Sequence, residues 1–260
     1  MLTSIRNERV QAVRRLHRRS ARVAERRFVV EGPQAVREAL ETLLELYTTD
    51  LDDPLARDAA RRGIDVVLVD DKVLGALGET VTPQGLIGVA PLLDVPLHTA
   101  FARPRLVSVL HNVGDPGNAG TVIRASDAAG ADAVVLTGDS VDPHNGKCVR
   151  ATAGSLWHLP VVAGADLPEA VERLKALGVQ VLATTGGGED DLDNLSDMGT
   201  LQQPTAWLFG SEAHGLPEEA LALADRRVRI PIFGRAESLN LATAASVCLY
   251  ASARAQRVLQ

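Results

Sequence analysis

Aromatic residues and cysteines are scarce in this chain, and both shortages exclude classes of protein. Aromatics make up 3% of the 260 residues, so we expect a core built from Ala, Val, Leu and Ile. Only Cys148 and Cys248 are present, which excludes a disulfide framework and a cysteine-based metal site. Two reduced thiols fit a cytoplasmic protein, and we expect no metal.

Long hydrophobic runs and common phosphate-binding motifs are also missing. The N-terminus lacks the apolar segment of a signal peptide, and the uncharged stretch from Ser238 to Ala253 is too short to span a bilayer. No G-x-G-x-x-G follows the first strand of the second half, and residues 186–190 (GGGED) lack the Lys and Ser/Thr of a P-loop. We therefore expect neither a membrane segment nor a dinucleotide-binding site.

Charge is distributed unevenly along the chain. Residues 1–27 hold nine arginines against Glu8 and Glu25, a net charge of +7, although the whole chain carries −6. A basic arm on an acidic body is typical of proteins that bind polyanions. A solvated amphipathic helix packed on its own domain gives the same pattern, and charge alone does not separate the two interpretations.

The periodicity of apolar residues predicts two α/β domains. Residues 1–95 alternate short strands and helices, with a helix predicted over residues 5–25, and the proline-containing stretch 96–105 is typical of a linker. Residues 106–260 alternate apolar strands with helices, which predicts a mostly parallel sheet covered on both faces. The predicted strands of this second part are 106–111, 133–137, 159–162, 179–185, 205–210 and 228–232. Ligands of such sheets bind beyond the carboxyl ends of the strands.

Three segments after predicted strands carry the chemistry. In residues 111–130, Asn118 can cap a helix, and Arg124 follows within reach of the same end of the sheet. In residues 208–217, Gly210 and Gly215 flank Glu212 and His214 in a turn. Such a turn can leave backbone groups open to a ligand such as an adenine ring, or its glycines can serve φ > 0 alone. His214 could serve as a catalytic base, but a single loop histidine without a visible partner is more often a bystander, which is the interpretation that we favour.

The third segment, residues 230–250, leads from a strand into an Ala-rich helix. Ser238 or Asn240 can cap this helix. Its small residues allow another backbone to approach closely, so it is predicted to be a buried helix that also contributes to a homodimer interface.

Together the three segments resemble the SpoU/TrmH family of RNA 2′-O-ribose methyltransferases, in the SPOUT superfamily. The resemblance covers residues 106–257 and rests on three motifs. They are N-x-G-x-x-x-R (Asn118, Gly120, Arg124), G-x-E-x-x-G-L (Gly210, Glu212, Gly215, Leu216) and I-P-I…S-L-N-x-A (Ile230, Pro231, Ile232, Ser238, Leu239, Asn240, Ala242). Ala213 stands where the family often has Gly. Residues 1–95 look like the small RNA-recognition domain of many members.

The resemblance implies an α/β fold with a deep trefoil knot, a homodimer, and an S-adenosylmethionine pocket inside the knot. That pocket would be lined by Thr184, Leu208, Gly210, Ile230, Pro231, Ser238 and Leu239. It also implies a catalytic role for Arg124 from the partner subunit, with Glu212, Asn240 and Asn118 as supporting residues. A guanidinium does not give up its proton readily, so we expect Arg124 to stabilise charge rather than to act as a base.

Other functions stay open at this point. A separate recognition domain favours ribosomal RNA as the substrate, and a tRNA loop is the alternative. A non-catalytic RNA-binding protein of the same fold, or a metabolic enzyme that binds a nucleotide, would share much of the pattern. The intact motif residues argue against the first, and the basic arm argues against the second. The modified nucleotide and the biological role, housekeeping or antibiotic resistance, are not visible in the sequence.

Overall fold

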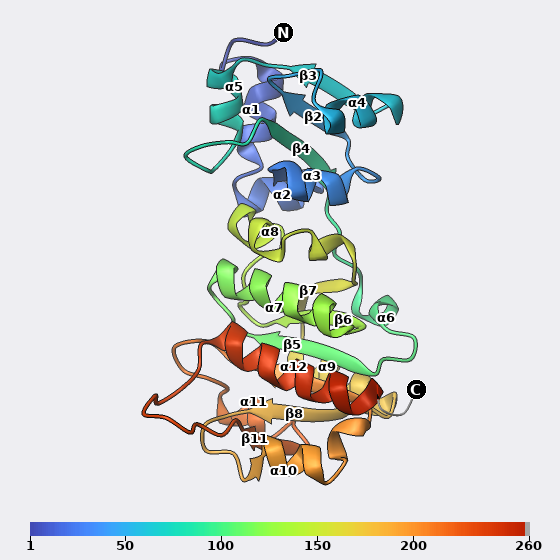
Figure 1. The fold of residues 1–260 in the computed structure, drawn as a ribbon, viewed down its shortest axis with the longest axis vertical. Helices are drawn as coiled ribbons and strands as arrows, with labels where there is room; N and C mark the ends of the chain where they lie inside the picture. Colours follow the sequence, from blue (N-terminus) through green and yellow to red (C-terminus); the bar gives the residue numbers. More distant parts are fainter. Residues whose placement is uncertain (258–260) are drawn as a thin grey trace. The chain divides into compact units, whose positions relative to one another are not determined.

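The computed structural model describes residues 1–257, which form two compact units (Figure 1). Of the described residues, the first unit comprises 1–93 and 144–157, and the second comprises 94–143 and 158–257. Our predicted division differs in two places. Residues 144–157, assigned to the second domain, pack with the first unit, and the predicted linker 96–105 contains helix α6 (Leu97–Ala100) of the second unit.

The first unit is built on a mixed four-stranded sheet with the order β1-β4-β2-β3. β4 pairs antiparallel with both of its neighbours, whereas β2 and β3 are parallel. The strands are β1 (Arg27–Glu31), β2 (Glu45–Thr48), β3 (Asp65–Leu68) and β4 (Leu86–Pro91).

Helices cover this sheet, and a core of Val, Leu, Ile and Tyr packs beneath α1 and α5. The helices are α1 (Glu8–Arg15), α2 (Arg19–Glu25), α3 (Pro33–Ala39), α4 (Pro54–Arg61), α5 (Asp71–Leu77), α8 (Gly146–Thr152) and the 3₁₀ helix η1 (Ser155–Trp157). One continuous helix was predicted over residues 5–25. The chain instead breaks at residues 16–18, because Val10, Val13 and Leu16 turn into the core and the chain must then reach β1.

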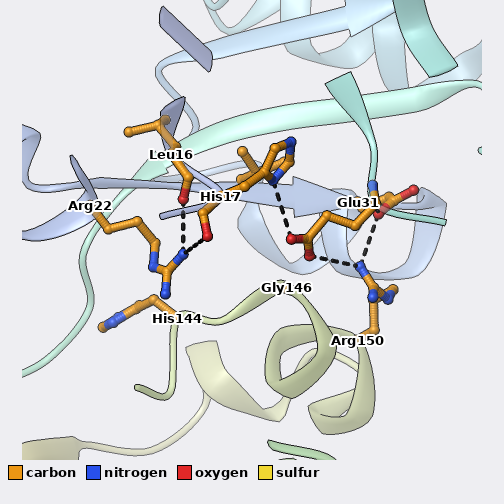
Figure 2. A pocket seen from close by; sticks show the side chains of 9 residues that line it. Leu16, His17, Arg22, Glu31, His144, Gly146 and Arg150 are labelled. Atoms are coloured by element: carbon orange, nitrogen blue, oxygen red, sulfur yellow. Dashed lines mark hydrogen bonds and ion pairs between the residues drawn. The ribbon is translucent and has the colours of Figure 1, made fainter. Parts of the chain in front are cut away.

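Specific contacts explain why residues 144–157 fold with the first unit. Arg150 donates a hydrogen bond to the buried carboxylate of Glu31 at 2.9 Å (Figure 2). The Trp157 indole donates to Thr42 Oγ1 at 3.1 Å, and its ring stacks on Phe28. An ion pair with one buried partner and a stacked aromatic pair stabilise the packing of this segment on the first unit. The periodicity of the sequence does not indicate such contacts.

The second unit is a seven-stranded sheet in which every pair of neighbouring strands is parallel, with the order β7-β6-β5-β10-β8-β11-β9. This confirms the predicted fold class. The strands are β5 (Leu106–His111), β6 (Ala133–Thr137), β7 (Val161–Ala165), β8 (Gln180–Thr184), β9 (Asp190–Asp191), β10 (Thr205–Phe209) and β11 (Arg226–Arg229).

Helices pack on both faces of this sheet, since alternate residues of each strand point to opposite sides. On one face, α6, α9 and α11 bury strand residues such as Val107 and Leu208. On the other face, α7 and α12 lie against each other (Figure 1). Ser126 of α7 hydrogen-bonds to Ser108, and Trp207 donates to Ser252 of α12. The remaining bounds are α7 (Pro116–Ala129), α9 (Leu167–Ala176), α10 (Leu192–Asp197), η2 (Thr200–Gln202), α11 (Glu218–Leu221) and α12 (Leu241–Arg257).

Strand β11 occupies an unusual place in the sheet. It lies between β8 and β9, two strands that follow each other directly in the sequence. The connection between them, residues 185–189, therefore passes around β11. Thr185 N donates to the Val228 carbonyl, and a side chain on Gly188 would overlap the backbone of β11. The predicted strand 228–232 was shifted, because the pairing segment is Arg226–Arg229.

No helix within residues 1–257 is long and apolar enough to cross a membrane.

Candidate active site

The carboxyl ends of four adjacent parallel strands meet at one edge of the second unit, because β5, β10, β8 and β11 are neighbours that run in the same direction. β5 is followed by the loop to α7, β10 by the turn 210–217, and β11 by the loop 230–240. These three loops are the segments in which the sequence places its motifs, so the parallel sheet gathers residues more than a hundred positions apart.

Helix α7 begins earlier than predicted, and this changes the role of Asn118. Asp115 is the N-cap, Pro116 occupies the first turn, and the Asp115 carboxylate accepts a hydrogen bond from Asn118 N at 2.8 Å. Our expectation that Asn118 caps the helix is therefore wrong. Because Asp115 satisfies the free backbone donor, the amide side chain of Asn118 is available for other partners.

The Asn118 side chain joins the other two loops by hydrogen bonds. Asn240 Nδ2 donates to Asn118 Oδ1 at 3.1 Å, and Asn118 Nδ2 donates to Glu212 Oε1 at 3.0 Å. Asn240 also caps α12, since its Oδ1 accepts from Ala242 N at 2.9 Å. Donors and acceptors follow one direction along this chain and end on a carboxylate. The arrangement fixes the orientation of both amides and links three loops through three side chains.

The turn that carries Glu212 is closed by its backbone. Ser211 and Gly215 exchange backbone hydrogen bonds of 2.9 and 3.1 Å. Gly215 has a φ of +66°, which favours glycine. Gly210 has an ordinary φ, but a Cβ there would overlap the backbone of Gly215 and Leu216. Both glycines are therefore required by the turn, Gly215 for its conformation and Gly210 for its close approach.

Arg124 differs from these three residues because it makes no contact with them. It is exposed on α7, and no hydrogen bond or ion pair joins its side chain to another of residues 1–257. The six residues from Asn118 turn the helix through about 240°, which places the two side chains on different sides of it. The structure thus brings Asn118, Glu212 and Asn240 together, and leaves Arg124 apart from them.

Comparisons with known proteins agree with this geometry. The model of the SpoU rRNA Methylase family matches residues 105–250, and the model of the MRM3-like substrate binding domain matches residues 7–88. The chain belongs to the SpoU rRNA methylase family. It is 34% identical to the 23S rRNA (guanosine(2553)-2′-O)-methyltransferase RlmP of Bacillus subtilis, over 96% of this chain and 97% of that one.

Two solved structures of SpoU-type enzymes have the same fold over almost the whole chain. The AdoMet-bound rRNA methyltransferase from Sinorhizobium meliloti is 32% identical, with a TM-score of 0.84 and 97% of each chain covered. The SpoU methyltransferase AviRb from Streptomyces viridochromogenes, in complex with AdoMet, is 30% identical, with a TM-score of 0.87. That match covers 97% of this chain and 99% of AviRb. These findings confirm the predicted family, the RNA methyltransferase activity and the cofactor S-adenosylmethionine.

The residues expected to line the cofactor pocket of this SpoU-family chain lie at or near the strand ends. Thr184 ends β8, and its hydroxyl donates to the Leu208 carbonyl at 3.2 Å. The Leu208 side chain is fully buried in the core, so only its backbone faces this edge for a ligand. Ile230, Pro231, Ser238 and Leu239 belong to the largely exposed loop that joins β11 to α12. Their contact with the cofactor stays a prediction.

His111 is a polar residue at the same edge that sequence reasoning did not single out. It ends β5, and its Nδ1 and Nε2 lie 3.0 Å from Thr137 Oγ1 and Asn112 Nδ2. Asn112 Oδ1 accepts from Asp139 N, which leaves Asn112 Nδ2 as the donor and makes Nε2 of a neutral His111 the acceptor. Burial lowers the pKa of His111, and the carboxylate of Glu219 offsets part of that effect. Its place as the polar residue that ends the apolar run 106–110, directly before Asn112, is the sequence signal that could have identified it, because ligands bind beyond the carboxyl ends of parallel strands.

His214 and a metal site remain to be considered. His214 is exposed, and no side-chain hydrogen bond joins it to another of the described residues. Its role stays a prediction. Across residues 1–257, no group of three or more His, Cys, Asp or Glu side chains is arranged to hold a metal ion.

Proposed function

We propose that this chain transfers the methyl group of S-adenosylmethionine to a ribose 2′-hydroxyl of 23S ribosomal RNA. The observation that carries the proposal is the hydrogen-bonded chain Asn240–Asn118–Glu212 at the carboxyl edge of the parallel sheet, in a member of the SpoU family. The similarity to RlmP extends over both units, which supports a ribosomal substrate over a tRNA loop.

The strand-end loops suit a bound S-adenosylmethionine. Gly210 leaves no side chain between the end of β10 and the turn beyond it, so backbone groups there are within reach of an adenine ring. On one side of this point, Thr184 ends the neighbouring strand β8, and Ile230 and Pro231 follow β11, the next strand of the sheet. Ser238 and Leu239 would close the site from the loop before α12. When bound, the cofactor supplies an electrophilic methyl group on a sulfonium.

Methyl transfer to a ribose needs a 2′-oxygen aligned with the methyl group and a place for its proton. The 2′-oxygen forms a bond to the methyl carbon as the carbon–sulfur bond breaks, and the proton leaves to water or to a neighbouring phosphate. Glu212 has one carboxylate oxygen, Oε2, beyond its bond with Asn118, and this oxygen can accept a hydrogen bond from the ribose or from a guanidinium. A guanidinium stabilises the negative charge that develops on the 2′-oxygen.

We assign that guanidinium to Arg124 of the partner subunit in a homodimer. Arg124 is exposed and lies apart from Glu212 in its own chain, so it is free to enter a second copy's site. Helix α12, which packs beside α7, leaves Val247 40% and Tyr250 54% exposed. Exposed apolar side chains on a helix that packs against α7, the helix of Arg124, support an interface on these two helices. The small residues Ala242 and Ala245 face the interior of their own unit instead.

We also propose that the chain is knotted in the second unit. The place of β11 between β8 and β9 supports this, because residues 185–189 must loop around it before the chain continues into α12. Cys148 and Cys248 are buried and form no disulfide with each other, which supports action in the reducing cytoplasm.

The function is tested by incubating the protein with S-adenosylmethionine and protein-free 23S ribosomal RNA, 16S ribosomal RNA or total tRNA. Each RNA is then digested to nucleosides and analysed by mass spectrometry. We expect a new 2′-O-methylated nucleoside from 23S ribosomal RNA alone. Methylation of a base would overturn the reaction, and methylation of tRNA alone would overturn the substrate.

The role of Arg124 across a dimer is tested by mixing two inactive variants, Arg124→Ala and Gly210→Trp. A mixed dimer contains one site with an intact cofactor pocket and an intact Arg124 from the partner, so activity should return on mixing. If the mixture stays as inactive as its components, Arg124 does not act in the partner's site.

A further inference from the structure

Residues 14–19 run from the end of α1 to the start of α2 and contain no acidic residue. Four of the six are arginines: Arg14, Arg15, Arg18 and Arg19. They lie at the end of α1, in the break, and at the start of α2. All four are exposed. Arg15 has an ion pair with Glu25 at 3.6 Å, whereas the side chains of Arg14, Arg18 and Arg19 contact no acidic group within residues 1–257. We call these three residues the junction arginines.

Several other arginines of the first unit are paired with acids, in contrast to the junction arginines. On and beside α4, Arg57 binds Asp52 at 2.6 Å, and Arg61 and Arg62 both bind Asp58 at 3.2 and 3.1 Å. Those pairs neutralise the positive charge of α4 locally. The junction arginines keep theirs, so a positive field from this part of the unit reaches solvent.

The junction also breaks a local rule of helix stability. Arg18 is the N-cap of α2 and makes no capping bond, and Arg19 is the first helical residue. Ser, Thr, Asp or Asn would cap the helix, and a cation at a helix N-terminus is unfavourable. Departures from such rules concentrate at functional sites. Arg18 and Arg19 therefore destabilise α2, so we infer that they serve binding and not the stability of the fold.

A buried arginine holds the junction in one shape. Arg22 is 3% exposed, and its Nη1 donates to the carbonyls of Leu16 and His17 at 2.9 Å each (Figure 2). These carbonyls end α1, so Arg22 ties α2 back to the end of α1. The exposed arginines on either side of the break are thereby presented from an ordered backbone, not from a flexible arm.

We propose that the junction arginines bind consecutive phosphates of the RNA backbone, and so form the electrostatic part of substrate binding. The proposal rests on the proposed function, since it assumes an RNA substrate. Guanidinium groups bind phosphate oxygens through two parallel hydrogen bonds, which suits a ribose–phosphate chain of any sequence. The surface would hold the RNA in place without reading its bases.

The test measures binding of a fluorescently labelled RNA hairpin of mixed sequence by anisotropy, between about 50 and 200 mM salt. The test variant is Arg14→Gln with Arg18→Gln and Arg19→Gln in the full chain. Its matched control is Arg57→Gln with Arg61→Gln and Arg62→Gln, which removes the same charge from paired positions. We expect the slope of log affinity against log salt to fall by about 1 per junction arginine, and to stay unchanged in the control.

Three results would overturn the proposal: an unchanged slope in the test variant, equal losses in both variants, or RNA affinity that does not depend on salt. Thermal unfolding and S-adenosylmethionine titration of each variant show that its two units are intact. If the wild type methylates RNA and the test variant keeps its slope, the surface is wrong and the proposed function stands. If the wild type methylates no RNA, the proposed function fails first.

Discussion

Two regions of this molecule expose polar side chains that core packing does not explain, and they are held in opposite ways. At the carboxyl edge of the large sheet, Asn240, Asn118 and Glu212 bind one another in a directed chain. At the junction of α1 and α2, the three junction arginines are exposed and contact no acidic group within residues 1–257, and Arg22 holds the backbone beneath them.

The difference follows from what each region has to do. Methyl transfer depends on alignment within a fraction of an ångström, and a closed hydrogen-bond chain supplies that order before the substrate arrives. Phosphate binding depends on charge, acts over a Debye length of about 10 Å and tolerates many poses. Arg124 combines both features, because it is exposed and unpaired in its own chain but is expected to act at an ordered site.

The largest expected effect comes from Arg124→Ala. Loss of a group that stabilises the developing charge should lower turnover by about 10²- to 10³-fold. Binding of S-adenosylmethionine should be unchanged, because Arg124 contacts none of the strand-end loops of its own chain. Single-turnover methylation and calorimetric titration measure the two quantities. Arg103→Ala, which removes another exposed arginine of the second unit, is the control and should retain full turnover. Near-normal turnover of Arg124→Ala would exclude its assigned role.

Asn240 separates the two tasks of one side chain. Asn240→Ala should lose the cap of α12, about 1 kcal/mol of stability, together with the bond to Asn118. Asn240→Ser should keep the cap but not reach Asn118. Both variants should lose about ten- to a hundredfold in turnover through misalignment, and only the alanine variant should unfold more easily. Thermal unfolding and turnover of both proteins check this. A serine variant with full activity would show that the Asn240–Asn118 bond does not matter for catalysis.

Arg22→Met should lower the free energy of unfolding, because the backbone at the junction loses hydrogen bonds. It leaves the Leu16 and His17 carbonyls without their buried donor, at a cost of about 1–3 kcal/mol. Denaturant unfolding measures the loss. Arg18→Gln removes an exposed cation at the same junction and should leave stability unchanged or slightly raised. Equal destabilisation by both changes would mean that Arg22 does not organise the junction.

The smallest effect concerns His111. Its pKa is lowered in the folded protein, so the unfolded chain takes up this proton first as the pH falls. The contribution of His111 is therefore intact above the ordinary histidine pKa of about 6.5 and declines below it. Stability of the wild type should fall more steeply between about pH 6.5 and 5 than that of His111→Gln. Denaturant titrations at each pH measure both stabilities. If stability depends on pH in the same way in the wild type and in His111→Gln, the titration of His111 does not contribute.

Most strands and all three site loops of the second unit can be predicted from the sequence. Its strands are buried on both faces, so they form continuous apolar runs that are easily recognised in the sequence. The predicted strands 106–111 and 133–137 have the bounds that the structure gives. The motifs located the three loops of the site because loops after parallel strands carry ligands. The short elements α6, β9 and α10 were missed, since each holds too few residues to show a period.

Contacts over long sequence distances could not be predicted from pattern. The Arg150–Glu31 ion pair joins residues 119 positions apart and moves residues 144–157 into the first unit. The Asn118 side chain became a link between loops only because Asp115 took the capping role, a competition between two good caps that propensity does not decide. The exposed arginines were counted in the sequence, but their lack of partners is visible only in three dimensions.

The central claim is that the loops after β10, β8 and β11 bind S-adenosylmethionine while Arg124 acts after binding. Isothermal titration of the cofactor into wild type, Gly210→Trp and Arg124→Ala tests it most directly, with circular dichroism to show that each protein is folded. We expect equal binding by wild type and Arg124→Ala, and none by a folded Gly210→Trp. Binding retained by Gly210→Trp, or absent from the wild type, would contradict it.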